Sequence, residues 1–315
     1  MLNLHPPGAK PAVETAWIDL LSPTETEIRL VEDFTGHRLP TLDELSAIER
    51  SSQLIVDGDK LQLSCPVVVD ADTDHPGVSH VGMILTPKLL VTVRFGVLKA
   101  FEATAARACP PGHKHDAIEI FTALLEAFVD RQADILEAAR AQLDSISHGV
   151  FRASPQQIRR VARSNEQLRA LLGRLGRIGE RISIIRDGML GVGRIAGFTQ
   201  ETAKGWIGPE YLTRLKAVGL DIDSLNLFEE HLSNKVQFLL DAIVGFIGIE
   251  QNDIFKVLTV FSVVGIFPTL VAGWYGMNFR NMPEYGWAYG YQWGIGMIVL
   301  STIIPLIWFK WRGWL

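Results

Sequence analysis

Residues 257–279, VLTVFSVVGIFPTLVAGWYGMNF, decide the fold, because all 23 positions lack Lys, Arg, Asp, Glu and His. A second run of 25 residues, 285–309, also lacks these side chains, although its aromatic and glycine-rich start places the span near 293–309. A helix needs roughly 20 apolar residues to cross a hydrocarbon core of about 30 Å. The two runs therefore predict a transmembrane hairpin. A buried hairpin of a soluble protein is the alternative, but two such runs at the end of a chain rarely form a core.

The charges beside the two spans predict their orientation. Lys256 precedes the first span, Lys310 and Arg312 follow the second, and the loop between carries only Arg280 and Glu284. Positive residues favour the cytoplasmic side of a membrane, so both chain termini are expected in the cytoplasm. The first ten residues contain no apolar core of a signal peptide, so the region before residue 250 is expected to stay on the same side.

Composition excludes several classes of function. The net charge of −5 disfavours a nucleic-acid-binding protein, and the mean hydropathy of +0.18 indicates a mixture of soluble and membrane parts. Cys65 and Cys109 match no zinc or redox spacing. His113 and His115 form an isolated His-x-His pair, for which a surface loop is favoured over a metal site. No nucleophile, acid–base pair or cofactor motif stands in suitable context, and the glycines of 191–193 lack that of a phosphate loop. An enzyme is therefore not expected.

The region before residue 100 reads as mixed strand and helix. Proline and capping residues predict helix starts at Ser22 and at Thr41, the second helix running to about residue 49. The Asp-Gly-Asp at 57–59 predicts a hairpin. Strands are expected at 16–20, 53–56, 60–64, 66–69, 81–85 and 89–95.

Helical periodicity replaces this pattern after residue 116. Apolar residues at three- and four-residue steps predict one long helix over 117–147. Ser154-Pro155 predicts the start of a second long helix, which ends near residue 186. A third long helix is predicted over 210–252, and it continues into the first span as a stalk. The expected fold class is an α+β cytoplasmic domain over 1–115, a long-helix and stalk region over 116–253, and a transmembrane hairpin with a cytoplasmic tail over 254–315.

Charge is segregated between two of these helices. Residues 152–194 contain ten arginines, whereas residues 210–253 contain eight acids. One interpretation is complementary packing or solvated faces. The other places the acidic stalk beside the path of a cation, because acidic walls raise the local cation concentration.

A short motif closes the first span. Gly276-Met277-Asn278 lies at its outer end, and Met282-Pro283-Glu284 follows in the loop. With the residues 268–272, PTLVA, just upstream, this arrangement resembles the bacterial CorA family of magnesium and cobalt transporters. Further matching stretches are 39–41, 48–49, 84–88, 249–252 and 309–315, so the resemblance covers nearly the whole chain.

The resemblance implies an inner-membrane homopentamer in which five copies of the first span line one pore. It implies influx of Mg²⁺, of Co²⁺ and, as a further candidate, of Ni²⁺, driven by the membrane potential and closed by intracellular Mg²⁺. The lipid bilayer and divalent cations are the expected partners, and no cofactor is expected apart from Mg²⁺ as substrate and regulatory ligand. Physically, two spans cannot enclose a pore, so an oligomer is required.

Neutral oxygens suit Mg²⁺, which gives up its water reluctantly. A ring of Asn278 amides with backbone carbonyls near Gly276 presents such oxygens, whereas a ring of carboxylates could bind too tightly for release. Gly276 lets the backbone leave the helix. These residues and Met277 form the predicted selectivity filter. Glu284 is either a cation-attracting group or an ordinary loop acid.

Other positions receive roles mainly from the resemblance. It assigns pore-lining positions to Asn252, Thr269 and Gly273, and the span offers Thr259 on its small, polar side, for which helix packing is the alternative. Phe255 and Ile266 would form apolar constrictions that gate by dewetting. Pro268 is either a pore hinge or a tolerated membrane proline. Asp221 and Asp223 are candidate regulatory metal ligands.

Two other functions compete. A zinc transporter of the same superfamily usually carries Gly-Ile-Asn and lacks the same loop, so Met277 and Glu284 favour the magnesium branch. The other competitor is a membrane-anchored sensor or scaffold that uses the hairpin only as a tether.

Overall fold

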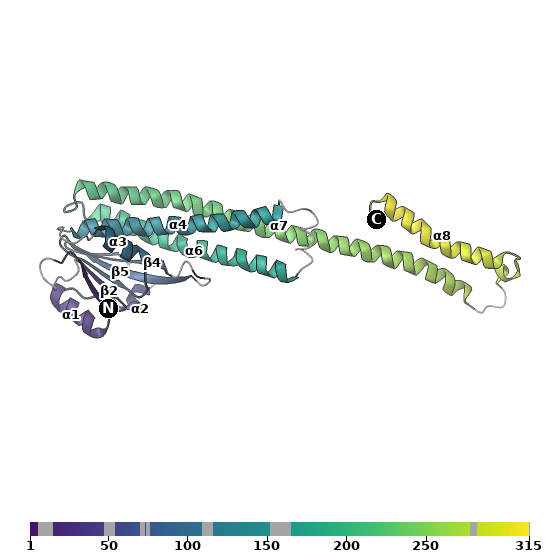
Figure 1. Cartoon of the computed structure of the whole chain (residues 1–315), viewed down its shortest axis with the longest axis horizontal. Helices are drawn as coiled ribbons and strands as arrows, with labels where there is room; N and C mark the ends of the chain where they lie inside the picture. The colour runs from purple at the N-terminus through teal and green to yellow at the C-terminus, as the bar shows by residue number, and fades with distance from the viewer. Residues whose placement is uncertain are drawn as a thin grey trace. The chain divides into compact units, whose positions relative to one another are not determined.

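A computed structural model describes residues 1–5, 15–46, 54–69, 73, 76–108, 116–151, 165–277 and 282–314. It confirms an α+β domain followed by a long helix and a second apolar helix (Figure 1). The sheet has six strands in the order β1-β2-β6-β5-β4-β3. Their bounds are β1 Leu2–His5, β2 Trp17–Leu21, β3 Leu54–Asp57, β4 Lys60–Val69, β5 Gly77–Leu85 and β6 Leu90–Arg94. β2 and β6 are parallel, and all other pairs are antiparallel.

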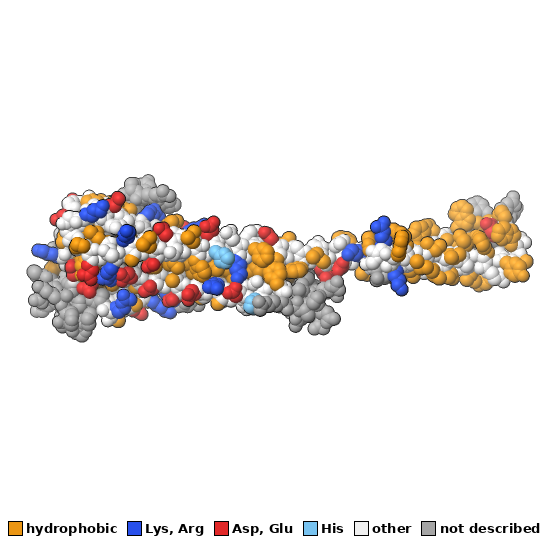
Figure 2. Space-filling view, turned by 90° about the horizontal axis from the view of Figure 1, so that it is seen from above, with side chains coloured by type: hydrophobic (Ala, Val, Ile, Leu, Met, Phe, Trp, Pro, Cys, Tyr) orange, Lys and Arg blue, Asp and Glu red, His pale blue; other side chains and the backbone are white. Residues whose placement is uncertain are grey.

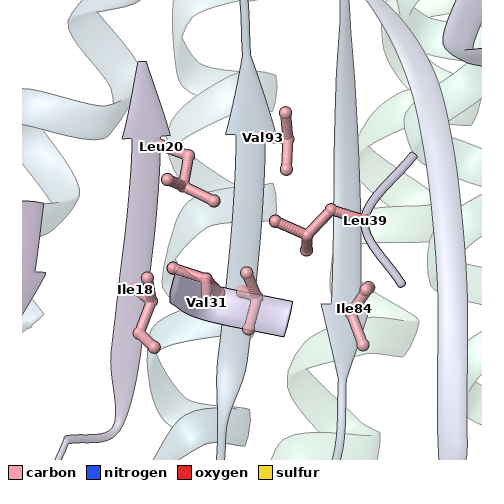
Figure 3. Packing of buried hydrophobic residues seen from close by; sticks show 7 residues of the cluster. Ile18, Leu20, Val31, Leu39, Ile84 and Val93 are labelled. Atoms are coloured by element: carbon pink, nitrogen blue, oxygen red, sulfur yellow. The ribbon is translucent and has the colours of Figure 1, made fainter. Parts of the chain in front are cut away.

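Two layers of helices cover the sheet. On one face, α1 (Glu25–Thr35) and the segment that leads to α2 (Leu42–Ser46) pack on an apolar cluster. Figure 3 shows Ile18 and Leu20 of β2 and Ile84 of β5 together with Val31 and Leu39 in this cluster. Side chains alternate between the faces of a strand, so Trp17 points to the other face. There its ring lies 5.9 Å from that of Phe101 in α3 (Lys99–Ala108).

Three long helices complete the soluble part: α4 (Ala117–Phe151), α6 (Asn165–Thr202) and the first part of α7 (Pro209–Tyr275). The prediction of a helix over 117–147 is confirmed, and buried residues such as Leu124, Leu136 and Leu143 recur on its inner face. The predicted end near residue 186 is wrong, because α6 continues to Thr202. Ser154 and Pro155 lie outside the described residues.

The predicted hairpin around Asp57-Gly58-Asp59 is confirmed by the pairing of β3 with β4. The predicted break between strands 60–64 and 66–69 is wrong, because β4 is continuous through Pro66. β3 pairs with β4 only as far as Leu63. Beyond that point, the described part of the sheet pairs β4 with β5 alone, so the missing N–H of Pro66 is tolerated at an edge.

Helix α1 begins later than its predicted start. The cap is Thr24, whose hydroxyl accepts from the backbone N–H of Glu27 while the Glu27 carboxylate accepts from the backbone N–H of Thr24. The predicted cap Ser22 lies before it, at a positive φ of 43°. The predicted start of α2 at Thr41 is confirmed by the same reciprocal bonding with Glu44.

Ion pairs join the helices of the soluble part. Arg214 of α7 donates two hydrogen bonds to Glu126 of α4, at 2.8 and 2.7 Å. Lys235 of α7 pairs with Asp144 of α4. Arg186 of α6 lies 2.8 Å from the carboxylate of Glu229, which is only 2% exposed. Of these three pairs, Arg186 with Glu229 joins the arginine-rich segment to the acidic one, and this pair supports the complementary-packing interpretation.

The chain divides into two compact units. The first comprises residues 1–152 and 169–240, and the second comprises residues 153–168 and 241–315. Helix α7 is continuous through the boundary at Leu240 and Asp241, as expected for a stalk. The second unit also contains a 3₁₀ turn, η2 (Pro283–Gly286), and helix α8 (Gly290–Trp311).

Candidate ion pathway

The second unit has the surface of a membrane protein. Helices α7 and α8 each contain an 18-residue window long and apolar enough to cross a membrane, and only 6% of each window is buried. Phe261 is 78% exposed and Trp274 is 65% exposed. Hydrophobic side chains cover this part of the molecule in Figure 2, whereas charged side chains gather over the first unit. Such a surface is stable in lipid and not in water.

The predicted pore-lining residues share one face of α7. Asn252, Phe255, Thr259, Ile266, Thr269 and Gly273 follow each other at steps of three, four and seven residues. This spacing places side chains on one stripe of a helix. All six are exposed in the single chain, so a bundle of copies could bring these stripes together. Their role in a pore stays a prediction.

The two threonines of this stripe donate to the backbone of their own helix. Thr259 Oγ1 donates to the Phe255 carbonyl at 2.7 Å, and Thr269 Oγ1 donates to the Gly265 carbonyl at 2.8 Å. A hydroxyl whose hydrogen is used in this way presents its oxygen as an acceptor. That arrangement suits contact with the water shell of a cation.

Pro268 lies inside α7 without ending the helix. It has no backbone N–H to donate to the Val264 carbonyl, so one bond of the helical ladder is missing. Both interpretations, hinge and tolerated proline, therefore stay open.

The helix ends where the filter motif begins. The N–H of Gly276 donates to the Ala272 carbonyl at 2.9 Å, and that of Met277 donates to the Trp274 carbonyl at 3.3 Å. The second bond has the three-residue spacing that tightens a last helical turn. The structure thus places Gly276 and Met277 at the end of α7. Asn278 follows directly and lies outside the described residues.

A tight turn leads from the Met-Pro-Glu sequence into α8. The N–H of Trp287 donates to the Glu284 carbonyl at 3.2 Å, and the N–H of Gly290 donates to the Trp287 carbonyl at 3.2 Å. A Cβ at position 290 would collide with the Glu284 carbonyl. Sequence reasoning missed Gly290, for which its place just after the Pro-Glu turn was the only signal.

A hollow of about 610 Å³ lies between the end of α7 and the start of α8. Gly276 and Glu284 both line it, together with Ala272, Tyr275 and the α8 residues Tyr291, Gly294, Ile295 and Ile298. The structure therefore brings one filter residue and the predicted cation-attracting carboxylate to the same cavity.

Asp221 and Asp223, the candidate regulatory ligands, are exposed on α7 in the first unit. Among the described residues no group of three or more His, Cys, Asp or Glu side chains is placed to hold a metal ion. A regulatory site at these two aspartates would therefore need ligands from another copy or from residues outside the described ranges.

Comparisons with known proteins identify the family of this chain. A family model described as "CorA-like Mg2+ transporter protein" matches residues 13–311. The magnesium transport protein CorA of Escherichia coli K12 is 32% identical over 100% of this chain and 96% of its own length. The CorA magnesium transporter of Methanocaldococcus jannaschii has a similar fold, with a TM-score of 0.76 and 16% sequence identity. The likeness covers 95% of this chain and 91% of the M. jannaschii chain. The cytoplasmic domain of ZntB from Vibrio parahaemolyticus has a TM-score of 0.53 and 12% identity over 73% of this chain and 86% of that one, a likeness of fold alone. On the family model and the full-length relative, the chain belongs to the CorA family of Mg²⁺ transporter proteins.

Proposed function

We propose that several copies of this chain form a channel that admits Mg²⁺ to the cytoplasm, with α7 lining the pore. The observation that carries the proposal is the Gly276-Met277-Asn278 motif, which stands at the end of a helix that is continuous from the soluble domain. Family membership supports a transporter and gives no support to an enzyme. It also places the protein in the inner membrane, with the soluble domain in the cytoplasm.

The filter would work through neutral oxygens. An amide from Asn278 of each copy, with backbone carbonyls of the preceding residues, would hold the ion with much of its water shell in place. Glu284 lines the same hollow as Gly276 and would raise the local concentration of cations at the outer mouth. Met277, 46% exposed in the single chain, would pack against neighbouring copies.

The membrane potential would drive influx without ATP. Moving one charge through 100 mV changes the free energy by about 2.3 kcal/mol, so a divalent ion gains about 4.6 kcal/mol. Co²⁺ and Ni²⁺ carry the same charge and are further candidate substrates. The E. coli relative, a magnesium transport protein by name, makes Mg²⁺ the first choice.

A homo-oligomer follows from the geometry of the spans. One chain offers two, which cannot surround a pore, and the predicted pore-lining stripe of α7 is exposed. The resemblance to CorA makes a pentamer the expected state. Phe255 and Ile266 would then form apolar rings that can close by dewetting.

Intracellular Mg²⁺ is the proposed signal for closure. Asp221 and Asp223 lie exposed on α7 and could bind Mg²⁺ between neighbouring copies. Changing both to Asn should leave more influx at millimolar internal Mg²⁺ than in the wild type. Equal inhibition of both proteins by internal Mg²⁺ would place the regulatory site elsewhere.

The decisive experiment is Mg²⁺ influx into sealed liposomes that contain the full-length protein, with an inside-negative potential. The wild type is compared with Asn278→Ala and with Asn234→Ala, a matched change at an exposed position of α7 in the soluble domain. Conduction by the wild type and Asn234→Ala, and none by Asn278→Ala, would support the channel and its filter. Zn²⁺ entry with a proton gradient in place of Mg²⁺ influx would favour the zinc transporter, and no flux of any divalent ion would favour the sensor or scaffold.

A further inference from the structure

A second hollow lies within the soluble domain, in the first unit. It has a volume of about 380 Å³, within the range of small-molecule sites. Its walls come from the segment that leads to α2, from α2 itself and from strands β3 and β4. Its lining includes Arg38, Glu44, Leu45, Ile55, Lys60, Gln62 and Ser64.

The floor of this hollow is polar where a core would be apolar. Lys60, Gln62 and Ser64 alternate along β4 and therefore lie on one face of the sheet. The odd-numbered Leu61, Leu63 and Cys65 lie on the opposite face and are fully buried. On the same side as the polar row, the neighbouring strands carry the apolar cluster beneath α1 (Figure 3). The polar row is thus a local departure from the pattern of the sheet.

Two members of the row, Ser64 and Lys60, have no side-chain partner among the described residues. Ser64 is 8% exposed, and its hydroxyl makes no hydrogen bond within the described part of the chain. A buried hydroxyl without a partner is unfavourable, and such a group in a cavity indicates that something else satisfies it. Within the part of the chain that the structure describes, no acid forms an ion pair with the Lys60 ammonium.

The charged side chains of the opposite wall pair with each other and not with Lys60. Arg38 Nη2 lies 2.5 Å from the Glu44 carboxylate, so these two charges neutralise each other. Glu44 also accepts from the backbone N–H of Thr41 at 2.9 Å, which fixes the start of α2. Leu45, 2% exposed, anchors this helix and offers an apolar surface to the hollow.

We propose that this hollow binds a small amphipathic organic anion. Its negative group would pair with Lys60, its apolar body would lie against Leu45 and Ile55, and a hydrogen-bonding group at the other end would reach Gln62 or Ser64. The row from Lys60 to Ser64 spans about 13 Å at 3.3 Å per residue. An elongated ligand therefore fits better than an inorganic anion, which could not reach both partnerless groups at once.

The test uses 4-nitrophenyl phosphate as the probe, because it joins an anionic group to a flat apolar body with acceptor oxygens at the far end. Binding to the full-length protein in detergent is followed by saturation-transfer NMR of the aromatic protons. Wild type should bind it saturably and should not bind the uncharged 4-nitrobenzyl alcohol. Lys60→Gln should weaken binding about tenfold or more, since it removes a charge-assisted contact. Lys88→Gln, an exposed lysine in the turn before β6, is the matched control and should bind like the wild type.

A second variant fills the hollow. Ser64→Leu should abolish probe binding, and its thermal melting by circular dichroism shows whether the domain still folds. If that variant does not fold, the comparison of Lys60→Gln with Lys88→Gln decides. Absence of saturable binding to the wild type, or equal affinity of Lys60→Gln and wild type, would overturn the proposal and leave only water in the hollow.

Discussion

Gly290 stands against the backbone carbonyl of Glu284, so close that no Cβ fits between the first turn of α8 and the Pro-Glu turn. The contact closes the connection between the two apolar helices without any side-chain interaction. Glu284, Gly290 and Gly276 all line the hollow at this connection. A single backbone contact thus shapes the outer mouth of the proposed pore.

Gly290→Ala should therefore disturb transport. Overpacking costs about 1–3 kcal/mol, and a shift of that size reduces the population of the conducting form by about fivefold to more than a hundredfold. Mg²⁺ influx into liposomes measures the effect. Gly296→Ala, six residues along the same helix, has open space at its Cβ and does not line the hollow, so it is the matched control and should conduct normally. Equal influx through both variants would show that the turn can open without loss of function.

Helix α6 approaches β4 through a second glycine. A Cβ at Gly191 would lie 2.9 Å from Cys65 Cβ and 3.0 Å from Pro66 Cδ, whereas a Cβ at Gly197 of the same helix would meet nothing within 4 Å. Gly191→Ala should lower the free energy of unfolding by about 1–3 kcal/mol through overpacking. Gly197→Ala should raise it by about 0.5–1 kcal/mol, because alanine favours a helix more than glycine does. Denaturant unfolding of the full-length protein in detergent measures both, and destabilisation of equal size in the two variants would contradict the packing role of Gly191.

Local signals made much of this fold predictable. The apolar length of the two spans and the helical period of α4 depend on neighbouring residues only, so both could be expected from the sequence. The strand β1 was missed because its four residues are stabilised by pairing with β2 and by packing of Leu2 and Leu4 on a distant cluster. The length of α6 was underestimated because its glycines suggest a break, whereas Gly191 serves a tertiary contact.

The candidate site was predictable as a motif and not as a geometry. Gly276 and Met277 lie at the end of α7 as expected, and the motif itself is local. The contact of Gly290 with Glu284 depends on how the loop folds back, which no local pattern encodes. The pore roles of residues such as Thr269 depend on other copies of the chain, so they remain predictions for the flux experiments.

A buried ion pair holds two parallel strands together. Arg94 of β6 donates to both carboxylate oxygens of Asp19 in β2 at 2.9–3.3 Å, and the side chains are 6% and 3% exposed. Arg94→Met would leave the Asp19 charge buried without its partner and should cost about 3–5 kcal/mol. Arg29→Met, which removes an exposed pair with Glu25, should cost about 0–1 kcal/mol.

Hydrogen exchange of the β2 and β6 amides in the full-length protein measures the loss of this ion pair. The double variant Asp19→Leu with Arg94→Met should recover much of the protection, because no unpaired charge remains. If Arg94→Met exchanged no faster than Arg29→Met, the ion pair would have no part in stabilising the sheet.

The thiol of Cys65 should make stability depend on pH in the alkaline range. Burial raises the pKa of Cys65 from 9.0 to about 12, although the nearby charge of Arg194 opposes the shift. The pKa is higher in the folded state, so the stabilising effect is fully present below pH 9. As the pH rises from 9 toward 12, the unfolded thiol ionises while the folded one stays neutral. Stability should then fall by up to about 1.4 kcal/mol per pH unit from this group.

Unfolding in urea at pH 8 and at pH 10.5 measures this dependence, with Cys109→Ser as the background so that one thiol titrates. Other groups, tyrosines above all, also ionise between pH 8 and pH 10.5 and change the stability of both proteins. Cys65→Ala in the same background is therefore the control, because it removes only the contribution of the buried thiol. The loss of stability between the two pH values should therefore be smaller in Cys65→Ala than in its parent. Iodoacetamide at pH 8 should leave Cys65 unmodified in the folded protein and react with it in urea, because the thiolate is the reactive form. Equal losses of stability in the two proteins, or rapid alkylation of the folded one, would mean that the Cys65 thiol is not held neutral beneath α6.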